Sequence, residues 1–173
     1  MIRQLEQAAR NFAPRGLVTV GQISIPNSSR NTIPAHVLFT VDLRHHEDKI
    51  IDQMEQAMRA ELGDVARSRG VETEISVYWN SPVTPFDRDC VAAVEKATTA
   101  LGYPHQAIVS GAGHDAINMA HYYPTAMVFI PCANGLSHNE AESASPEHVA
   151  QGADVLLNAV LARAGTGAKA ASC

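Results

Sequence analysis

The sequence predicts an α/β fold in two parts, a small α+β segment followed by a segment in which helices and strands alternate. Three observations support this prediction. Stretches with apolar residues at every second position, typical of half-buried strands, are interspersed with stretches of helical periodicity. Residues 80–89 (NSPVTPFDRD) contain two prolines close together, which favours a boundary there. Residues 125–131 (TAMVFIP) are almost continuously apolar, as expected for a strand covered on both faces.

The first part is expected to occupy residues 1–82 and to form a small sheet with helices on one side. Its opening helix presents an apolar face made by Ile2, Leu5, Ala9 and Phe12. A helix preceded by no strand suggests that this α+β sheet lacks one strand at its start. The expected elements are a helix at 2–12, strands at 17–25 and 36–44, a helix at 47–69 and a strand at 71–79.

The second part is expected to cover residues 83–164, with a disordered tail at 165–173. Asp87 is a candidate N-cap for its first helix, and Pro146 suits the first turn of its last one. Alternation of helix and strand favours a parallel sheet with helices packed on it. The expected elements are helices at 90–101, 113–123 and from 146, with strands at 105–110 and 125–131.

Composition argues against several classes of partner. The formal net charge is −5 and aromatic residues make up 5% of the chain, so neither nucleic acid nor an anionic membrane is expected as a partner. No apolar run is long enough to cross a bilayer, and the N-terminus lacks the apolar core of a signal peptide. Three widely spaced cysteines suit a reducing compartment rather than a disulfide framework. A cytoplasmic location is therefore expected.

Two glycine-containing loops follow predicted strands of the second part. In residues 110–116 (SGAGHDA), His114 lies at the start of a helix, where free N–H groups favour an anion or a developing oxyanion. The alternative is a tight turn that needs glycine only for its backbone. Residues 133–142 (ANGLSHNEAE) place His138 among polar side chains after an apolar strand, where sites collect in α/β sheets. A solvated polar loop is the alternative there.

A third candidate lies at the end of the strand at 36–44. Arg44 is on the polar face, and its planar guanidinium suits bidentate binding of a carboxylate; Asn31 offers both a donor and an acceptor. An ordinary surface ion pair with Asp42 is the alternative. The neighbouring His45 and His46 are interpreted as structural or exposed, because adjacent residues at a strand end point in opposite directions.

Four segments in this order resemble the C-terminal portion of the hydantoinase/carbamoylase amidohydrolases. This family includes N-carbamoyl-L-amino acid hydrolases, β-ureidopropionases and allantoate amidohydrolases, and it is related to the dinuclear zinc aminopeptidase-like fold. The paired GAGHDA and GLSHNEAE elements, preceded by NxIP and DxR, make the resemblance specific. The segments are residues 28–46 (SSRNTIPAHVLFTVDLRHH), 81–87 (SPVTPFD), 108–120 (IVSGAGHDAINMA) and 129–142 (FIPCANGLSHNEAE).

The resemblance implies a role for each candidate residue. His138 would be a metal ligand, and Asn31 with Arg44 would bind the substrate carboxylate in the active site of a partner subunit. His114 would be the catalytic residue that donates a hydrogen bond to the substrate or transition state, in a pocket shaped partly by Gly113. Residues 1–82 would be a lid and dimerisation domain, which implies a homodimer, and residues 83–164 the closing part of a partial zinc-aminopeptidase-like catalytic domain.

The resemblance also implies a substrate and a cofactor. The complete enzyme would cleave the C–N bond of an N-carbamoyl (ureido) acid, such as an N-carbamoyl-L-amino acid or N-carbamoyl-β-alanine, with divalent zinc, manganese or cobalt. The other metal ligands of the family are not in this sequence. We therefore expect no tightly bound metal and no activity from this chain alone. The alternatives are a non-catalytic dimerisation or binding fragment and half of a split metallopeptidase.

Overall fold

The chain forms two compact units that are described separately. The computed structural model describes residues 1–167. The first unit is Met1–Val83 and the second starts at Thr84, one residue after the position expected from the prolines. Within the described residues, no helix combines the length and the apolar character needed to cross a membrane.

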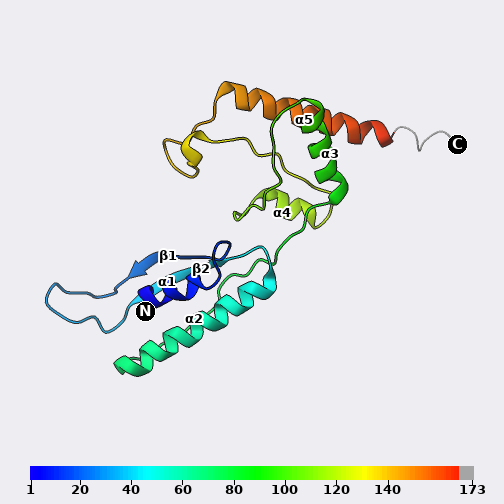
Figure 1. Ribbon diagram of the computed structural model, residues 1–173. Helices are drawn as coiled ribbons and strands as arrows, with labels where there is room; N and C mark the ends of the chain where they lie inside the picture. The colour runs from blue at the N-terminus through cyan, green and yellow to red at the C-terminus, as the bar shows by residue number, and fades with distance from the viewer. Residues whose placement is uncertain (168–173) are drawn as a thin grey trace. The chain divides into compact units, whose positions relative to one another are not determined.

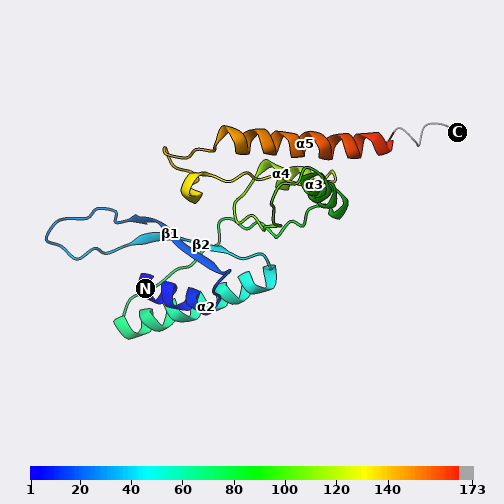
Figure 2. The ribbon, with the colours of Figure 1, turned by 45° about the horizontal axis from the view of Figure 1, so that its top comes forward.

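The first unit is a two-stranded antiparallel sheet with two helices on one face (Figures 1 and 2). Both helices and the first two strands form where their periodicity predicted them, whereas the strand expected at 71–79 does not form. The long helix ends at Gly70, whose left-handed backbone (φ of 63°) is the conformation that glycine adopts most readily at a helix C-terminus. The elements are α1 (Ile2–Arg10), β1 (Leu17–Ser24), β2 (Leu38–Arg44) and α2 (Asp48–Arg69).

The hydrophobic core of this unit lies between the sheet and the helices. Leu5, Met58 and Leu62 are its buried centre. The expected alternation along β2 is confirmed, because its odd-numbered residues contact this centre while Asp42 and Arg44 lie on the other face. The apolar face of α1 is rotated from the expected one, since Ala8 is buried and Ile2 is exposed. The strand residues packed on the centre are Val18, Val20, Phe39, Val41 and Leu43.

The pairing of the strands fixes which residues share the outer face of the sheet. Leu17 pairs with Arg44 at one end and Ser24 with Leu38 at the other, and the register shifts between Val20 and Ile23. At this irregularity the backbone N–H of Gln22 donates to the Thr40 hydroxyl oxygen at 3.1 Å. A side chain thereby replaces a ladder partner, as is common at bulges. The outer face consequently carries threonine, aspartate and arginine side chains.

The second unit is built on the packing of two helices. Its buried centre consists of Ala97, Val155 and Ala159, whose small side chains let the helices approach closely. Tyr103 donates a hydrogen bond of 3.2 Å to Asp154 beside this contact. The elements are α3 (Arg88–Ala100), α4 (Asp115–Ala120), the short 3-10 helix η1 (Ala133–Gly135) and α5 (Pro146–Gly167).

Three predicted strands are absent from the described residues. Residues 71–79, 105–110 and 125–131 have the alternating or apolar composition of strands, yet β1 and β2 form the only sheet within residues 1–167. A strand is stabilised by hydrogen bonds to a neighbour, and these segments make no such ladder there. Several of their apolar side chains are consequently exposed, among them Val77 and Val109. The parallel sheet expected in the second part is therefore not observed.

The last helix differs from its prediction in length and in its buried face. It continues to Gly167, so the disordered tail expected from residue 165 is wrong for its first three residues; residues 168–173 lie outside the described ones. Of the five predicted core residues only Val155 is buried, because α3 covers a single stripe of α5. The other four, all exposed, are Val149, Leu156, Val160 and Leu161.

The predicted N-cap of α3 is confirmed and has a consequence for acid stability. Asp87 accepts a hydrogen bond from the backbone N–H of Cys90 at 2.8 Å, and this bond lowers the pKa of the Asp87 carboxyl. Because the folded pKa is below the unfolded value of about 3.9, the stabilisation is present above that pH and is lost as the pH falls through the folded pKa. We expect Asp87→Ala to lower the melting temperature at neutral pH and to have a diminishing effect below about pH 4. Circular dichroism melts across this range check it, and an equal difference at every pH would contradict it.

Candidate functional site

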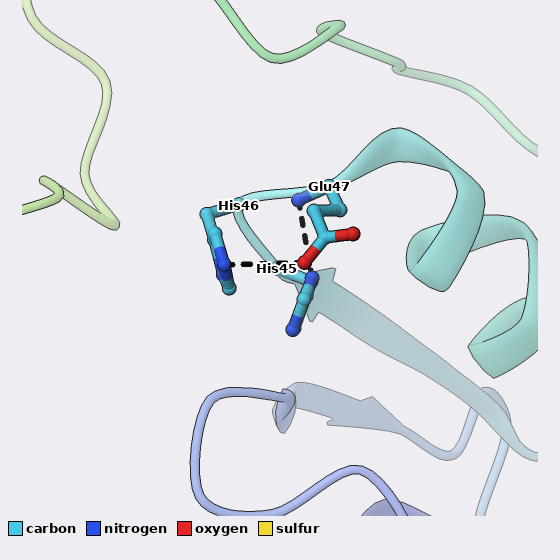
Figure 3. A group of neighbouring side chains, drawn as sticks. All are labelled: His45, His46 and Glu47. Carbon is cyan, nitrogen blue, oxygen red and sulfur yellow. Dashed lines mark hydrogen bonds and ion pairs between the residues drawn. The ribbon is translucent and has the colours of Figure 1, made fainter.

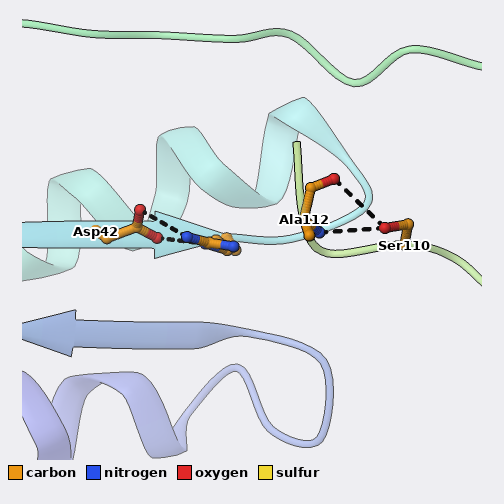
Figure 4. Close-up of polar contacts among 4 residues, drawn as sticks. Asp42, Ser110 and Ala112 are labelled. Carbon is orange, nitrogen blue, oxygen red and sulfur yellow. Dashed lines mark hydrogen bonds and ion pairs between the residues drawn. The ribbon is translucent and has the colours of Figure 1, made fainter. Parts of the chain in front are cut away.

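The outer face of the first unit carries an arginine held rigidly by a neighbouring carboxylate. Arg44 Nε donates to Asp42 Oδ1 at 2.7 Å and Nη2 donates to Asp42 Oδ2 at 3.2 Å (Figure 4). Residues two apart on a strand share a face, which is why β2 brings these side chains together. The hydrogen bond to Asp42 raises the pKa of the Arg44 guanidinium, so it stays charged. The pair therefore presents a fixed, planar cation at the surface.

A groove of about 420 Å³ runs beside this pair on the same face of the sheet. Asp42 and Arg44 are about half exposed within it, at 41% and 48% of their side-chain surfaces. Thr19 and Thr40 could have been found from the period of two along their strands. Gln22 could not, because the register shift between Val20 and Ile23 changes the phase of β1, and neither could Tyr78, which comes from the segment after α2. The groove is lined by Thr19, Gly21, Gln22, Thr40, Val41, Asp42, Arg44 and Tyr78.

Asn31 lies away from this groove. It belongs to the loop between β1 and β2, where its Oδ1 accepts hydrogen bonds from Ser29 at 2.9 Å and Thr32 at 3.5 Å. The loop joins β2 at Leu38, whereas Arg44 is at the far end of that strand. Six steps along a strand span about 20 Å. One chain therefore does not bring Asn31 and Arg44 together at one end of the sheet.

In the second unit, His114 is positioned just before α4 by a local hydrogen-bond network. Its Nε2 lies 2.8 Å from Ser110 Oγ. The same oxygen accepts a hydrogen bond from the backbone N–H of Ala112 at 3.2 Å (Figure 4). The imidazole and the Phe129 ring make a T-shaped contact with centroids 5.5 Å apart. A half-buried histidine with one nitrogen fixed by a hydroxyl can donate or accept a proton at a defined place. No close neighbour meets a Cβ built on Gly113, so this glycine is not required by packing within the described chain.

His138 occupies a structured polar loop. Its backbone is left-handed (φ of 55°), and its N–H donates to Glu142 Oε2 at 2.8 Å. Asn139 Oδ1 accepts from the backbone of Ala141 at 2.9 Å in the same turn. The imidazole is exposed. Among residues 1–167 no set of three potential ligand atoms within 4.8 Å of one another includes His138.

The two adjacent histidines after β2 do not point in the opposite directions expected for them. His45 and His46 follow the last residue of the strand, where the chain bends, so the alternation of directions ends before them. Their rings lie on the same side with centroids 4.2 Å apart (Figure 3). Ligand atoms of His45, His46 and Glu47 all lie within 4.8 Å of one another. Only the reason given for that interpretation, opposite directions of the two rings, is wrong, because strand geometry was extended beyond the last residue of β2.

Comparison with known proteins places the chain in a family of hydrolases. Residues 5–162 match the model of peptidase family M20/M25/M40, and the chain belongs to this family. Two relatives have names that are more specific than this family description. The chain is 40% identical over 93% of its length to an N-carbamoyl-L-amino-acid amidohydrolase of Rhizobium meliloti, and 31% identical over 82% of its length to an allantoate amidohydrolase of Bacillus subtilis.

Solved structures give the same result. A hydantoinase/carbamoylase family amidase from Burkholderia ambifaria is 54% identical and matches 94% of this chain with a TM-score of 0.86. The resemblance to the hydantoinase/carbamoylase amidohydrolases is thereby confirmed. The chain covers 38% of that structure and 39% of the Rhizobium meliloti protein, so it spans about two fifths of the length of these relatives.

Proposed function

We propose that this chain forms part of a metal-dependent amidohydrolase that hydrolyses the C–N bond of N-carbamoyl (ureido) acids, releasing ammonia, carbon dioxide and the free amino acid. The observation that carries the proposal is the Asp42–Arg44 pair beside a polar groove, in a chain similar to a carbamoyl-amino-acid hydrolase. A ureido acid has a carboxylate at one end, and a fixed guanidinium is the side chain best suited to bind it.

Each proposed role uses a property of the residue concerned. Arg44 binds the carboxylate, and Asp42 fixes the orientation of the guanidinium so that less side-chain entropy is lost on binding. His114, held by Ser110, donates a hydrogen bond to the carbonyl group of the substrate. Asn31 contributes a second contact to the carboxylate. Asn31 and Arg44 are at opposite ends of β2. We therefore propose a homodimer formed through the first unit, in which the carboxylate of one substrate is contacted by Arg44 of one subunit and Asn31 of the other.

The family to which the chain belongs generally depends on divalent metals, which activate water and polarise the scissile carbonyl. His138 is the residue of this chain proposed to ligate such an ion. Its exposed imidazole can do so, but catalytic sites of this kind use about three protein ligands, and the described residues around His138 do not supply a further two. The described residues around His138 therefore do not complete a catalytic metal centre, and we propose that its other ligands are supplied from elsewhere in the complete enzyme.

A second candidate substrate class is the dipeptide, because the matching family model is that of peptidases. A dipeptide also ends in a carboxylate, so the Asp42–Arg44 pair suits both classes. The names of the relatives, which are amidohydrolases acting on carbamoyl amino acids and allantoate, favour the ureido acids. The two substrates differ in the group that leaves: ammonia from one and an amino acid from the other.

A chimera tests this proposal directly. The matched segment of the Rhizobium meliloti amidohydrolase would be replaced by this chain, with which it is 40% identical. We expect the purified chimera to release ammonia from N-carbamoyl-L-amino acids and to lose this activity when His138 is replaced by asparagine. His121→Asn, at an exposed histidine of the same unit, is the matched control. A folded chimera that cleaves dipeptides and spares ureido acids would overturn the proposal in favour of the peptidase.

A further inference from the structure

The bend between β2 and α2 gathers three metal-binding side chains that the proposed function does not use. His45, His46 and Glu47 are consecutive, and their ligand atoms lie within 4.8 Å of one another (Figure 3). They belong to the first unit, whereas the metal ligand proposed above, His138, belongs to the second. We propose that these three residues form a separate site for a borderline divalent transition cation, of which Zn²⁺ is the probe.

The donors are of the right kind. Two imidazoles and one carboxylate make the ligand set that zinc takes in several sites, with the fourth position open to water. With bonds of about 2.0–2.1 Å, tetrahedral geometry puts neighbouring donor atoms about 3.3 Å apart. His46 Nε2 and Glu47 Oε1 are already 3.3 Å apart. One edge of the tetrahedron is therefore present before any cation arrives.

The remaining adjustment involves only side chains outside the hydrophobic core. His45 must come closer to the other two donors, and its ring is at present held by a hydrogen bond of 3.1 Å from the backbone N–H of Glu47 to His45 Nδ1. Exchanging that weak donor for a cation uses the same lone pair on the ring nitrogen. Glu47 is 60% exposed at the side chain and can rotate toward the cation, while the His46 ring, 21% exposed, already lies at the required distance from Glu47 Oε1.

A competing cation limits the affinity of the site. Arg15 Nη1 lies 2.9 Å from His46 Nε2, and a guanidinium can only donate, so it occupies the lone pair that a metal would need. Binding of Zn²⁺ must therefore displace Arg15, which is exposed and able to move away. This competition predicts that removing Arg15 strengthens metal binding while removing a histidine weakens it. An affinity for Zn²⁺ that rises without Arg15 and falls without His46 would distinguish a specific site from general adsorption of the cation to surface histidines.

The test is titration of the 173-residue chain with Zn²⁺ at neutral pH, followed by calorimetry and equilibrium dialysis. We expect binding at this site to weaken by at least about tenfold in His45→Gln and in His46→Gln. Arg15→Ala is expected to bind about fivefold more tightly, because a like charge a few ångströms away is removed. Circular dichroism of each variant establishes that it is folded.

His121→Gln is the matched control, since it removes an exposed histidine of the other unit and should leave this binding unchanged. Unchanged Zn²⁺ affinity in both His45→Gln and His46→Gln would overturn the proposal, as would an equal loss in His121→Gln. Failure of Arg15→Ala to raise the affinity would also contradict it. None of these outcomes depends on hydrolysis of a ureido acid, so the site and the proposed function can fail separately.

Discussion

Replacing Arg44 by alanine is expected to raise the KM of the chimera for an N-carbamoyl-L-amino acid by a factor that corresponds to about 2–4 kcal/mol of binding free energy. This is roughly 30- to 900-fold. The cause is the loss of a guanidinium fixed by Asp42 through bonds of 2.7 and 3.2 Å. Binding of the carboxylate is remote from the bond that breaks, so kcat should fall much less than kcat/KM.

Two further variants separate this effect from a general loss of charge. Asp42→Asn keeps the cation and removes the carboxylate that orients it, so we expect a smaller rise in KM. Arg59→Ala removes another arginine of the same unit, paired with Glu55 on α2 at 2.7 Å, and is expected to leave the kinetics unchanged. Exposed ion pairs contribute about 0–1 kcal/mol to stability, so all three variants should fold. An unchanged KM in Arg44→Ala would remove this residue from the site.

Truncation of Leu5 to alanine is expected to destabilise the first unit by about 2–5 kcal/mol. Leu5 is 2% exposed and lies at the centre of the core between α1, α2 and the sheet. The unit has few fully buried large side chains, so the cavity left by the isobutyl group has little around it that can collapse into the space. The lost transfer free energy of the side chain and its lost packing contacts therefore both contribute to the destabilisation.

Urea denaturation followed by circular dichroism measures this loss as a lower midpoint with an unchanged slope. Leu38→Ala is the matched control, because Leu38 has the same side chain in the same unit but is 66% exposed. Its effect should stay within about 0.5 kcal/mol. Equal midpoints for the two variants would mean that α1 does not pack on the sheet as described.

The helices and the local hairpin could be predicted from the sequence because their signals are local. The helical periodicity of α2, the Gly70 that ends it and the Asp87 cap of α3 each act within a few residues. The state of residues 71–79, 105–110 and 125–131 could not be predicted reliably. The periodicity of apolar residues indicates which side chains share a face, but it does not identify the neighbouring strand that must supply the hydrogen bonds. The apolar residues assigned to the core of α5 failed for the same reason.

The candidate site shows the same division. Arg44 and Asp42 were placed together from the period of two alone, and the structure joins them by two hydrogen bonds. The grouping of His45 with His46 was missed because it depends on the bend at which β2 stops. The separation of Asn31 from Arg44 follows from the length of β2 and was already implied by the strand predicted at 36–44.

The exposed position of Trp79 makes it an intrinsic fluorescence probe of the surface of the first unit. Trp79 is the only tryptophan of the chain, is 71% exposed, and adjoins Tyr78 of the groove beside Arg44. Its indole is already in contact with water, so its fluorescence has little to report when the core unfolds, which is why circular dichroism suits the stability measurements. The same exposure makes its emission sensitive to any molecule that covers residue 79. Binding at that part of the surface can thus be followed by intrinsic fluorescence, with no dye attached.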